Sequence, residues 1–145
     1  MSADDTQAKA ESAAKSHKGS VLLVDDDKFL VDMYSMKFVH EGYSVQACLS
    51  TADAIDSLKS GFTADAILFD LTMPERDGFS FLQALRDEKV AQNAVLIALT
   101  NQSDDAEKQK ASEFGAHRYI VKASMIPSEV VNIVGEELAK KGGRS

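Results

Sequence analysis

Cysteine is almost absent from this chain: the only one, Cys48, has no partner for an internal disulfide. It lies in an apolar segment, so we expect a small buried side chain and not a redox centre. No apolar run approaches the roughly 18 residues of a membrane span, and the N-terminus lacks the apolar core of a secretory signal. The cytoplasm is therefore the expected compartment.

Basic residues are also scarce, with 16 Lys and Arg against 23 Asp and Glu, and the net charge is −7. Nucleic acids and anionic membrane surfaces bind through cations that displace counterions, so both are disfavoured as partners. Metal cations and basic or mixed protein surfaces remain open. The length of 145 residues and the apolar content of 44% are typical of one soluble globular domain.

The two ends of the chain differ from its middle. Residues 1–19 contain no large apolar side chain after Met1, which predicts a flexible polar tail. We expect the folded domain over residues 20–140 and a flexible end over 141–145. The sequence of this end also fits the start of a linker in a longer protein.

Apolar runs that fit strands alternate along the domain with segments of helical periodicity. This alternation predicts an α/β domain, with parallel strands, right-handed crossovers and helices on both faces of the sheet. The expected strands span 21–24, 43–48, 66–69, 94–99 and 118–121; the expected helices span 28–41, 50–61, 78 onward, 103–114 and 127 onward, with Ser50 and Ser103 as N-caps.

Polar side chains follow four of the five predicted strands, at the point where each strand ends. The carboxyl ends of parallel strands meet at one edge, where open α/β sheets bind ligands. Two carboxylates about 4 Å apart repel by about 4 kcal/mol at an effective dielectric constant of about 20, so gathered acids need a countercharge. Mg²⁺ or Mn²⁺ fits that need. The groups are Asp25, Asp26 and Asp27 after the first strand, Asp70 after the third, Thr100 after the fourth and Lys122 after the fifth.

An aspartate between a metal ion and a lysine stays ionised and can attack phosphorus, giving an aspartyl phosphate. The metal and Lys122 would neutralise the phosphoryl oxygens, and the Thr100 hydroxyl would donate a hydrogen bond to one of them. Taken singly, each group has an ordinary interpretation as a helix cap, a loop acid, a turn residue or a surface lysine. Their occurrence together, in this order, favours a phosphoryl site.

The motifs resemble those of response-regulator receiver domains over about residues 20–140. They read Val-Asp-Asp-Asp at 24–27, Asp-Leu-Thr-Met-Pro-Glu-Arg-Asp-Gly at 70–78, Leu-Thr at 99–100 and Tyr-Ile-Val-Lys at 119–122. The resemblance implies the flavodoxin-like fold, a five-stranded parallel sheet in the order 2-1-3-4-5 with five helices.

Carried over to this chain, the resemblance makes Asp70 the phosphoacceptor. Asp26 and Asp70 would ligate Mg²⁺ directly, together with the backbone carbonyl of Thr72, and Asp25 would act largely through water. The resemblance gives Asp27 no role in the site. The helix dipole, which favours an acid at the start of a helix, is enough to explain its position.

The same resemblance implies a switch. Thr100 and Lys122 would hold the phosphoryl group, and Tyr119 would turn inward when Thr100 moves toward it. The donor would be a histidine kinase or a histidine phosphotransfer protein. A downstream protein would bind the face made by the fourth helix, fifth strand and fifth helix. The domain would catalyse only its own phosphorylation and slow dephosphorylation, as a monomer or as a phosphorylation-dependent dimer.

Two positions depart from the family pattern. Ala123 stands where proline usually follows the lysine, and a cis bond before a non-proline residue costs about 3 kcal/mol, so we expect a trans bond and an altered loop. Asn101 stands where a small residue usually follows the threonine. We expect its larger side chain to hinder water and so to slow dephosphorylation.

Three alternatives belong to other functional classes. A degenerate receiver would act as a phosphorylation-independent interaction module, but the complete set of site residues argues against it. A flavodoxin-like cofactor protein would have a phosphate-cradling loop after the first strand, where the acids at 25–27 would instead repel phosphate. An aspartyl phosphohydrolase would carry a second acid at position 72, which is threonine. The histidines, His17, His40 and His117, show no metal-ligand spacing.

Overall fold

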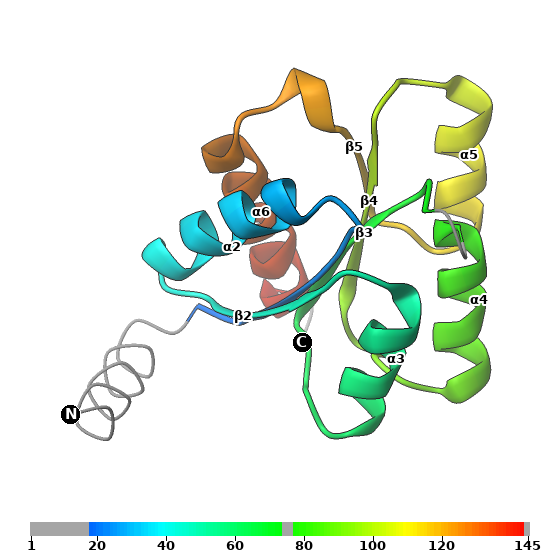
Figure 1. Ribbon diagram of the computed structural model, residues 1–145, viewed down its shortest axis with the longest axis horizontal. Coiled ribbons are helices and arrows are strands. Elements are labelled where there is room, and N and C mark those ends of the chain that lie inside the picture. The colour runs from blue at the N-terminus through cyan, green and yellow to red at the C-terminus, as the bar shows by residue number, and fades with distance from the viewer. Residues whose placement is uncertain (1–17, 74–76, 144–145) are drawn as a thin grey trace.

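The computed structural model describes residues 18–73 and 77–143 of the chain. Five parallel strands form one sheet in the order β2-β1-β3-β4-β5, which confirms the expected flavodoxin-like arrangement (Figure 1). The strands are β1 (Ser20–Val24), β2 (Ser44–Cys48), β3 (Ala66–Asp70), β4 (Val95–Thr100) and β5 (Arg118–Val121); the helices are α2 (Lys28–His40), α3 (Thr51–Lys59), α4 (Gly78–Glu88), α5 (Asp105–Glu113) and α6 (Pro127–Gly143), with a 3-10 turn at Lys122–Ser124.

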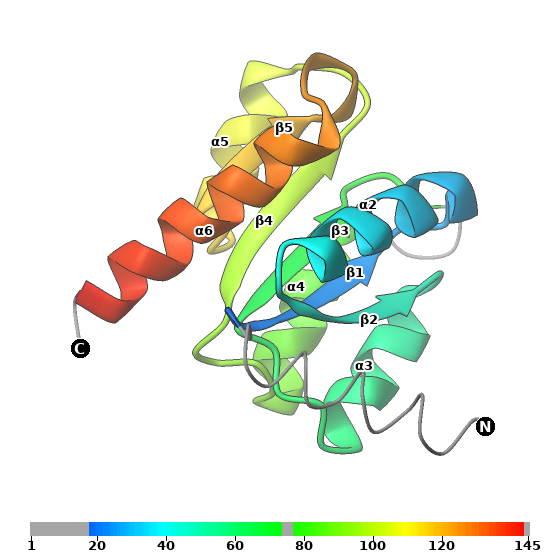
Figure 2. The ribbon, with the colours of Figure 1, turned by 90° about the vertical axis from the view of Figure 1, so that its left-hand side faces the viewer.

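Helices cover both faces of the sheet. Helices α2 and α6 lie on one face, and α3, α4 and α5 lie on the other, as Figure 1 and the rotated view in Figure 2 show. Alternate strand residues face the two layers, so Leu22 and Phe69 join one core while Leu23 and Leu68 join the other. The middle strand β3 is buried along its whole length, which explains why its sequence is apolar up to Asp70.

Capping residues set where most helices begin. The Asp27 side chain accepts a hydrogen bond from the Leu30 N–H, and Ser50 caps α3 as predicted by accepting one from Asp53. The predicted cap Ser103 is wrong by one residue. Asp104 caps α5 instead, accepting from the Glu107 N–H at 2.9 Å, since a carboxylate is a favourable acceptor at the positive end of a helix.

The described structure extends slightly past the expected domain limits. The Lys18 N–H donates to the Gly42 carbonyl at 2.9 Å, and the Gly19 carbonyl accepts from Ser44, so the ordered backbone begins before residue 20. Helix α6 continues to Gly143, past the expected end at residue 140. The predicted tail over residues 1–17 lies outside the described residues. Within the described ranges, no helix has the length and apolarity needed to cross a membrane.

Candidate functional site

The site lies at the carboxyl edge of the sheet, where β1 and β3 end side by side. The register pairs Val24 with Phe69, so the next residues, Asp25 and Asp70, emerge next to each other. Asp26 follows in the same turn. One carboxylate oxygen from each of Asp25, Asp26 and Asp70 lies within 4.8 Å of the others. Three of the four acids that sequence analysis placed at this edge therefore come together, whereas Asp27 caps α2.

Two of these carboxylates are buried and held by the backbone. Asp25 and Asp70 are each only 2% exposed, whereas Asp26 is exposed. Oδ1 of Asp25 accepts from the Asp27 N–H at 3.0 Å, and Oδ1 of Asp70 accepts from the Thr72 N–H at 3.0 Å. These bonds fix one oxygen of each buried carboxylate, and the other oxygen, Oδ2, faces Lys122.

Lys122 follows β5 and reaches back across the edge to both buried acids. Its Nζ lies 2.6 Å from Asp25 Oδ2 and 3.3 Å from Asp70 Oδ2. Burial by itself lowers the pKa of a lysine, but the ion pairs with Asp25 and then Asp70 outweigh it, so the pKa of Lys122 is raised. The ammonium is therefore a fixed positive charge in the site.

The carboxylate of Asp70 is electrostatically unfavourable as it stands. Burial raises its pKa most, and the neighbouring Asp25 raises it further; the Thr72 N–H and Lys122 act in the opposite direction without cancelling the rise. Three carboxylates and one ammonium have a formal charge of −3 + 1 = −2. A divalent cation would neutralise that charge, and the clustered oxygen donors suit the hard ions Mg²⁺ and Mn²⁺.

Thr100, the last residue of β4, is buried at the same edge, but its hydroxyl is turned into its own loop. Oγ1 donates to the Gln102 carbonyl at 3.2 Å and lies 3.5 Å from the Gln102 nitrogen. The hydroxyl is thus engaged with residue 102. Before it can donate to a group on Asp70, the Thr100 hydroxyl must give up its hydrogen bond to the Gln102 carbonyl.

Tyr119 lies beside this loop, on β5, and its ring is half-buried. Its hydroxyl donates to Glu107 Oε1 at 2.7 Å and accepts from the Asp104 N–H at 3.2 Å. The hydroxyl is therefore tied to the start of α5. Sequence analysis did not find Glu107, because the contact joins residues on two separate elements and no motif marks it.

The two departures from the family pattern lie around the site. Ala123 is the middle residue of the 3-10 turn, and all described peptide bonds are trans, as expected at this position. Asn101 is exposed next to Thr100. Among the histidines, His117 accepts a hydrogen bond from the Leu96 N–H on Nδ1, and His40 is exposed at the end of α2; His17 lies outside the described residues.

Comparison with known proteins identifies relatives of this chain. The family described as "Response regulator receiver domain" matches residues 21–134. Response regulator ArlR of Staphylococcus aureus is 29% identical over 102 residues, which are 70% of this chain and 45% of ArlR. The chain therefore spans less than half the length of the curated relatives that it matches.

The chain is also similar to several solved structures. A CheY-like receiver domain protein from Methanospirillum hungatei is 21% identical with a TM-score of 0.79, covering 88% of this chain and 98% of its own. The receiver domain of the Francisella response regulator 1452 is 27% identical with a TM-score of 0.71, covering 83% and 98%. The Vibrio cholerae chemotaxis protein CheY4 is 25% identical with a TM-score of 0.75, covering 81% and 97%.

Proposed function

The chain belongs to the response regulator receiver domain family of two-component systems, and on that basis we propose that Asp70 accepts a phosphoryl group from a phosphohistidine. The donor is a histidine kinase or a histidine phosphotransfer protein. The observation that supports this most is the position of Asp70, buried at the carboxyl edge between a cluster of acids and the Lys122 ammonium. We propose the cytoplasm as its compartment, since ATP-dependent donors act there.

The proposed metal ligands are Asp26 and Asp70 with the Thr72 backbone carbonyl, and Asp25 acts largely through water. The distances among the three carboxylates support this assignment. When bound, Mg²⁺ or Mn²⁺ supplies charge neutralisation for the acids and for the phosphoryl oxygens. Asp26 is the exposed member of the set, so the cation and the phosphoryl group approach from its side.

In the transfer step, Oδ2 of Asp70, the oxygen that faces Lys122, attacks phosphorus, an O–P bond forms, and the P–N bond to the donor imidazole breaks. The leaving imidazole takes the electron pair of the broken bond. The Thr72 N–H keeps hold of Oδ1 and so orients the carboxylate. Lys122 offsets the negative charge of the phosphoryl oxygens, because its Nζ already lies 3.3 Å from the attacking oxygen. Water then slowly hydrolyses the new O–P bond, which releases phosphate and restores the Asp70 carboxylate.

The switch follows from the hydroxyls of Thr100 and Tyr119. A phosphoryl group on Asp70 offers an acceptor that competes with the Gln102 carbonyl for the Thr100 hydroxyl. When Thr100 turns, Tyr119 moves into the vacated space and leaves Glu107 and Asp104. The surface of α5, β5 and α6 then changes its affinity for a downstream protein, by a local charge change that biases two conformations.

Chemical trapping of the acyl phosphate tests this assignment. The phosphorylated chain is reduced with borohydride, which converts an aspartyl phosphate to homoserine, and the product is mapped by peptide mass spectrometry. We expect homoserine at position 70 and nowhere else. Unmodified Asp70 in a chain that receives phosphate from the donor would overturn the assignment. If the chain receives no phosphate at all, it acts as an interaction module independent of phosphorylation.

A further inference from the structure

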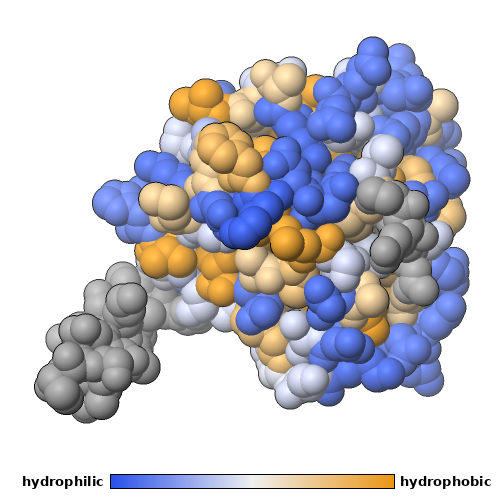
Figure 3. Space-filling model, viewed as in Figure 1, coloured by the Kyte–Doolittle hydropathy of each residue, from blue (hydrophilic) through white to orange (hydrophobic). Residues whose placement is uncertain are grey.

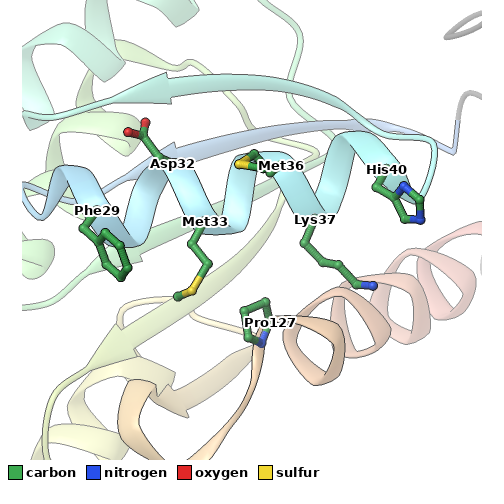
Figure 4. A pocket seen from close by; sticks show the side chains of 7 residues that line it. All are labelled: Phe29, Asp32, Met33, Met36, Lys37, His40 and Pro127. Carbon is green, nitrogen blue, oxygen red and sulfur yellow. The ribbon is translucent and has the colours of Figure 1, made fainter.

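Helix α2 presents one face to solvent and another to the core. The outer face carries a groove of about 730 Å³ that Pro127 borders, and Figure 4 shows it from close by. Phe29 and Met36 line this groove and are 78% and 74% exposed. In Figure 3, hydrophobic and polar residues are interspersed over α2 and α6. The inner face of α2 is buried, and its residues are Val31, Tyr34 and Phe38.

The Tyr34 hydroxyl is a buried polar group without a partner. Tyr34 is 2% exposed, and within residues 18–73 and 77–143 its hydroxyl oxygen makes no hydrogen bond. Its neighbours on the inner face, Val31 and Phe38, are apolar. A buried hydroxyl that stays unpaired lowers stability, and phenylalanine would fill the same space without that penalty. The resting structure thus gives the hydroxyl no role, which points to a role in another state of the protein.

The ion pair of the phosphoryl site lies on the same side of the sheet as Tyr34. Leu23 of β1 and Ile120 of β5 pack with Tyr34 in one core. Asp25 and Lys122 each follow two residues later, where these strands end, and side chains two residues apart along a strand face the same side. Oδ2 of Asp25 is buried, and the Lys122 ammonium that offsets its charge lies 2.6 Å away. The tyrosine and the ion pair are therefore on one side of the sheet.

The helix geometry brings the Tyr34 hydroxyl toward this ion pair. Side chains of a helix lean toward its N-terminus, and α2 begins at Lys28, three residues after Asp25. The ring of Tyr34 therefore extends toward the carboxyl edge of the sheet. The pKa of Tyr34 is raised, mainly by burial; the positive charge of Lys122 lowers it, and the negative charge of Asp25 raises it. Both charges act on the hydroxyl, which stays protonated at neutral pH and can donate a hydrogen bond.

We propose that Tyr34 is a positioning residue for phosphoryl transfer: its hydroxyl donates to Oδ2 of Asp25, directly or across one water molecule, once Lys122 is drawn to the phosphoryl oxygens. The inference rests on the proposed transfer to Asp70. In the resting chain Lys122 serves both acids, at 2.6 Å from Asp25 and 3.3 Å from Asp70. Phosphoryl oxygens on Asp70 attract the ammonium away from Asp25, which leaves the buried Oδ2 with its charge uncompensated. The Tyr34 hydroxyl then takes the place of Lys122 beside that oxygen.

This exchange accounts for a hydroxyl that is unpaired at rest. A hydrogen bond that forms only after Lys122 moves stabilises the site during transfer and not in the resting chain. Removal of the Tyr34 hydroxyl should therefore slow transfer without lowering the stability of the fold. A tyrosine with a structural role alone would show the reverse, a loss of stability with unchanged transfer.

Two tyrosine variants of the full chain test the proposal. Intact mass follows phosphoryl uptake from acetyl phosphate with Mg²⁺, and urea unfolding without divalent metal measures stability. We expect Tyr34→Phe to slow uptake by about tenfold, the effect of one hydrogen bond to a charged group, without lowering the unfolding midpoint. The matched control, Tyr43→Phe, changes another buried tyrosine of the same core, whose hydroxyl lies beside Gly135, and should leave uptake unchanged. Unchanged uptake by Tyr34→Phe, equal slowing by both variants, or a lower unfolding midpoint for Tyr34→Phe would overturn the proposal.

Fluorine NMR tests the contact without any phosphate. The chain has three tyrosines, so incorporated 3-fluorotyrosine gives three signals, which single Phe variants assign. Lys122→Ala leaves Oδ2 of Asp25 without its cation, so the Tyr34 signal should shift while the Tyr43 signal does not. The shift should vanish when Lys122→Ala is made in a chain that carries Asp25→Ala, since the acceptor is gone. No shift, or a shift that persists in that chain and so reports only the lost lysine charge, would overturn the proposal.

The two measurements also separate this inference from the function on which it rests. An unaltered chain that takes up no phosphoryl group would overturn the proposed function and, with it, a role for Tyr34 in transfer. Normal uptake by the unaltered chain with an unmoved Tyr34 signal would overturn the role of Tyr34 alone.

Discussion

The Lys122 ammonium lies closer to Asp25 than to Asp70, with Nζ 2.6 Å from Oδ2 of Asp25 and 3.3 Å from Oδ2 of Asp70. The lysine thus holds the two buried carboxylates of the proposed metal site. It neutralises part of their charge, and it also competes with any cation that binds them. The same residue is therefore expected to oppose metal binding and to assist phosphoryl transfer.

Lys122→Ala should consequently bind Mg²⁺ several-fold more tightly while taking up phosphate more slowly. The first effect follows from losing a positive charge beside two ligands, and the second from losing charge stabilisation of the phosphoryl oxygens. Isothermal titration calorimetry measures the affinity. Lys37→Ala, which removes a surface charge from α2, is the control and should change neither property. Weaker Mg²⁺ binding by Lys122→Ala would contradict this account of the site.

Asp70→Asn should stabilise the protein at neutral pH in the absence of divalent metal. Burial raises the pKa of Asp70, so ionisation of this carboxyl is less favourable in the folded state than in the unfolded chain. The resulting loss of stability is fully present above the raised pKa, and it disappears as the pH falls below the ordinary value of 3.8. Urea unfolding at pH 7 should therefore show a higher midpoint for the variant, and the difference should shrink toward pH 3. A lower midpoint at pH 7 would contradict the prediction.

Two glycine substitutions should have opposite effects on stability. A Cβ at Gly78 would lie 2.8 Å from the Leu71 Cα and 2.9 Å from the Asp70 carbonyl oxygen, both of them backbone atoms. Gly78→Ala must move the backbone at the end of β3, where Asp70 lies, so we expect a loss of about 1–3 kcal/mol in unfolding free energy and slower phosphoryl uptake.

Gly135→Ala is the matched comparison. Gly135 lies inside α6, and its added Cβ would meet only the Tyr43 hydroxyl, at 3.4 Å. Alanine favours the helix by about 0.8–1 kcal/mol over glycine, so we expect a gain approaching that size with unchanged phosphoryl uptake. Urea unfolding measures both variants. Equal losses of unfolding free energy from the two substitutions would show that Gly78 is no more tightly packed than Gly135.

Asn101→Ala should lose its phosphoryl group faster than the unaltered chain. The Asn101 side chain is exposed directly after Thr100, at the edge where water must approach the phosphorylated Asp70. Shortening it opens that approach, and a rate increase of several-fold is expected. Mass spectrometry measures the dephosphorylation rate from the decay of purified phosphoprotein in the presence of Mg²⁺. Unchanged or slower decay would mean that Asn101 does not restrict water.

The resemblance to receiver domains implied the sheet order, and the strand pattern itself predicted the meeting of Asp25, Asp26 and Asp70, because parallel strands bring their carboxyl ends to one edge. The sequence did not predict that the Lys122 ammonium lies closer to Asp25 than to Asp70. That difference depends on which carboxylate oxygen of each aspartate accepts a backbone N–H. The cap of α5 was misplaced by one residue because Ser103 and Asp104 are both good N-caps.

Contacts between side chains on different elements were also beyond the sequence. The Tyr119–Glu107 hydrogen bond joins residues whose spacing carries no signal, and the groove on α2 became visible only once the exposure of Phe29 and Met36 was known. The helical stripe of α2 combines residues that face the core, such as Tyr34 and Phe38, with residues that face outward. Periodicity alone does not separate these two faces when both are apolar.

The most direct test of the central claim is the intact mass of the chain after incubation with acetyl phosphate and Mg²⁺. We expect a labile gain of about 80 Da, the mass of one phosphoryl group on a carboxylate nucleophile. The gain should be absent from Asp70→Asn and absent when EDTA removes the metal. No gain in the unaltered chain, or an equal gain in Asp70→Asn, would contradict phosphoryl acceptance by Asp70.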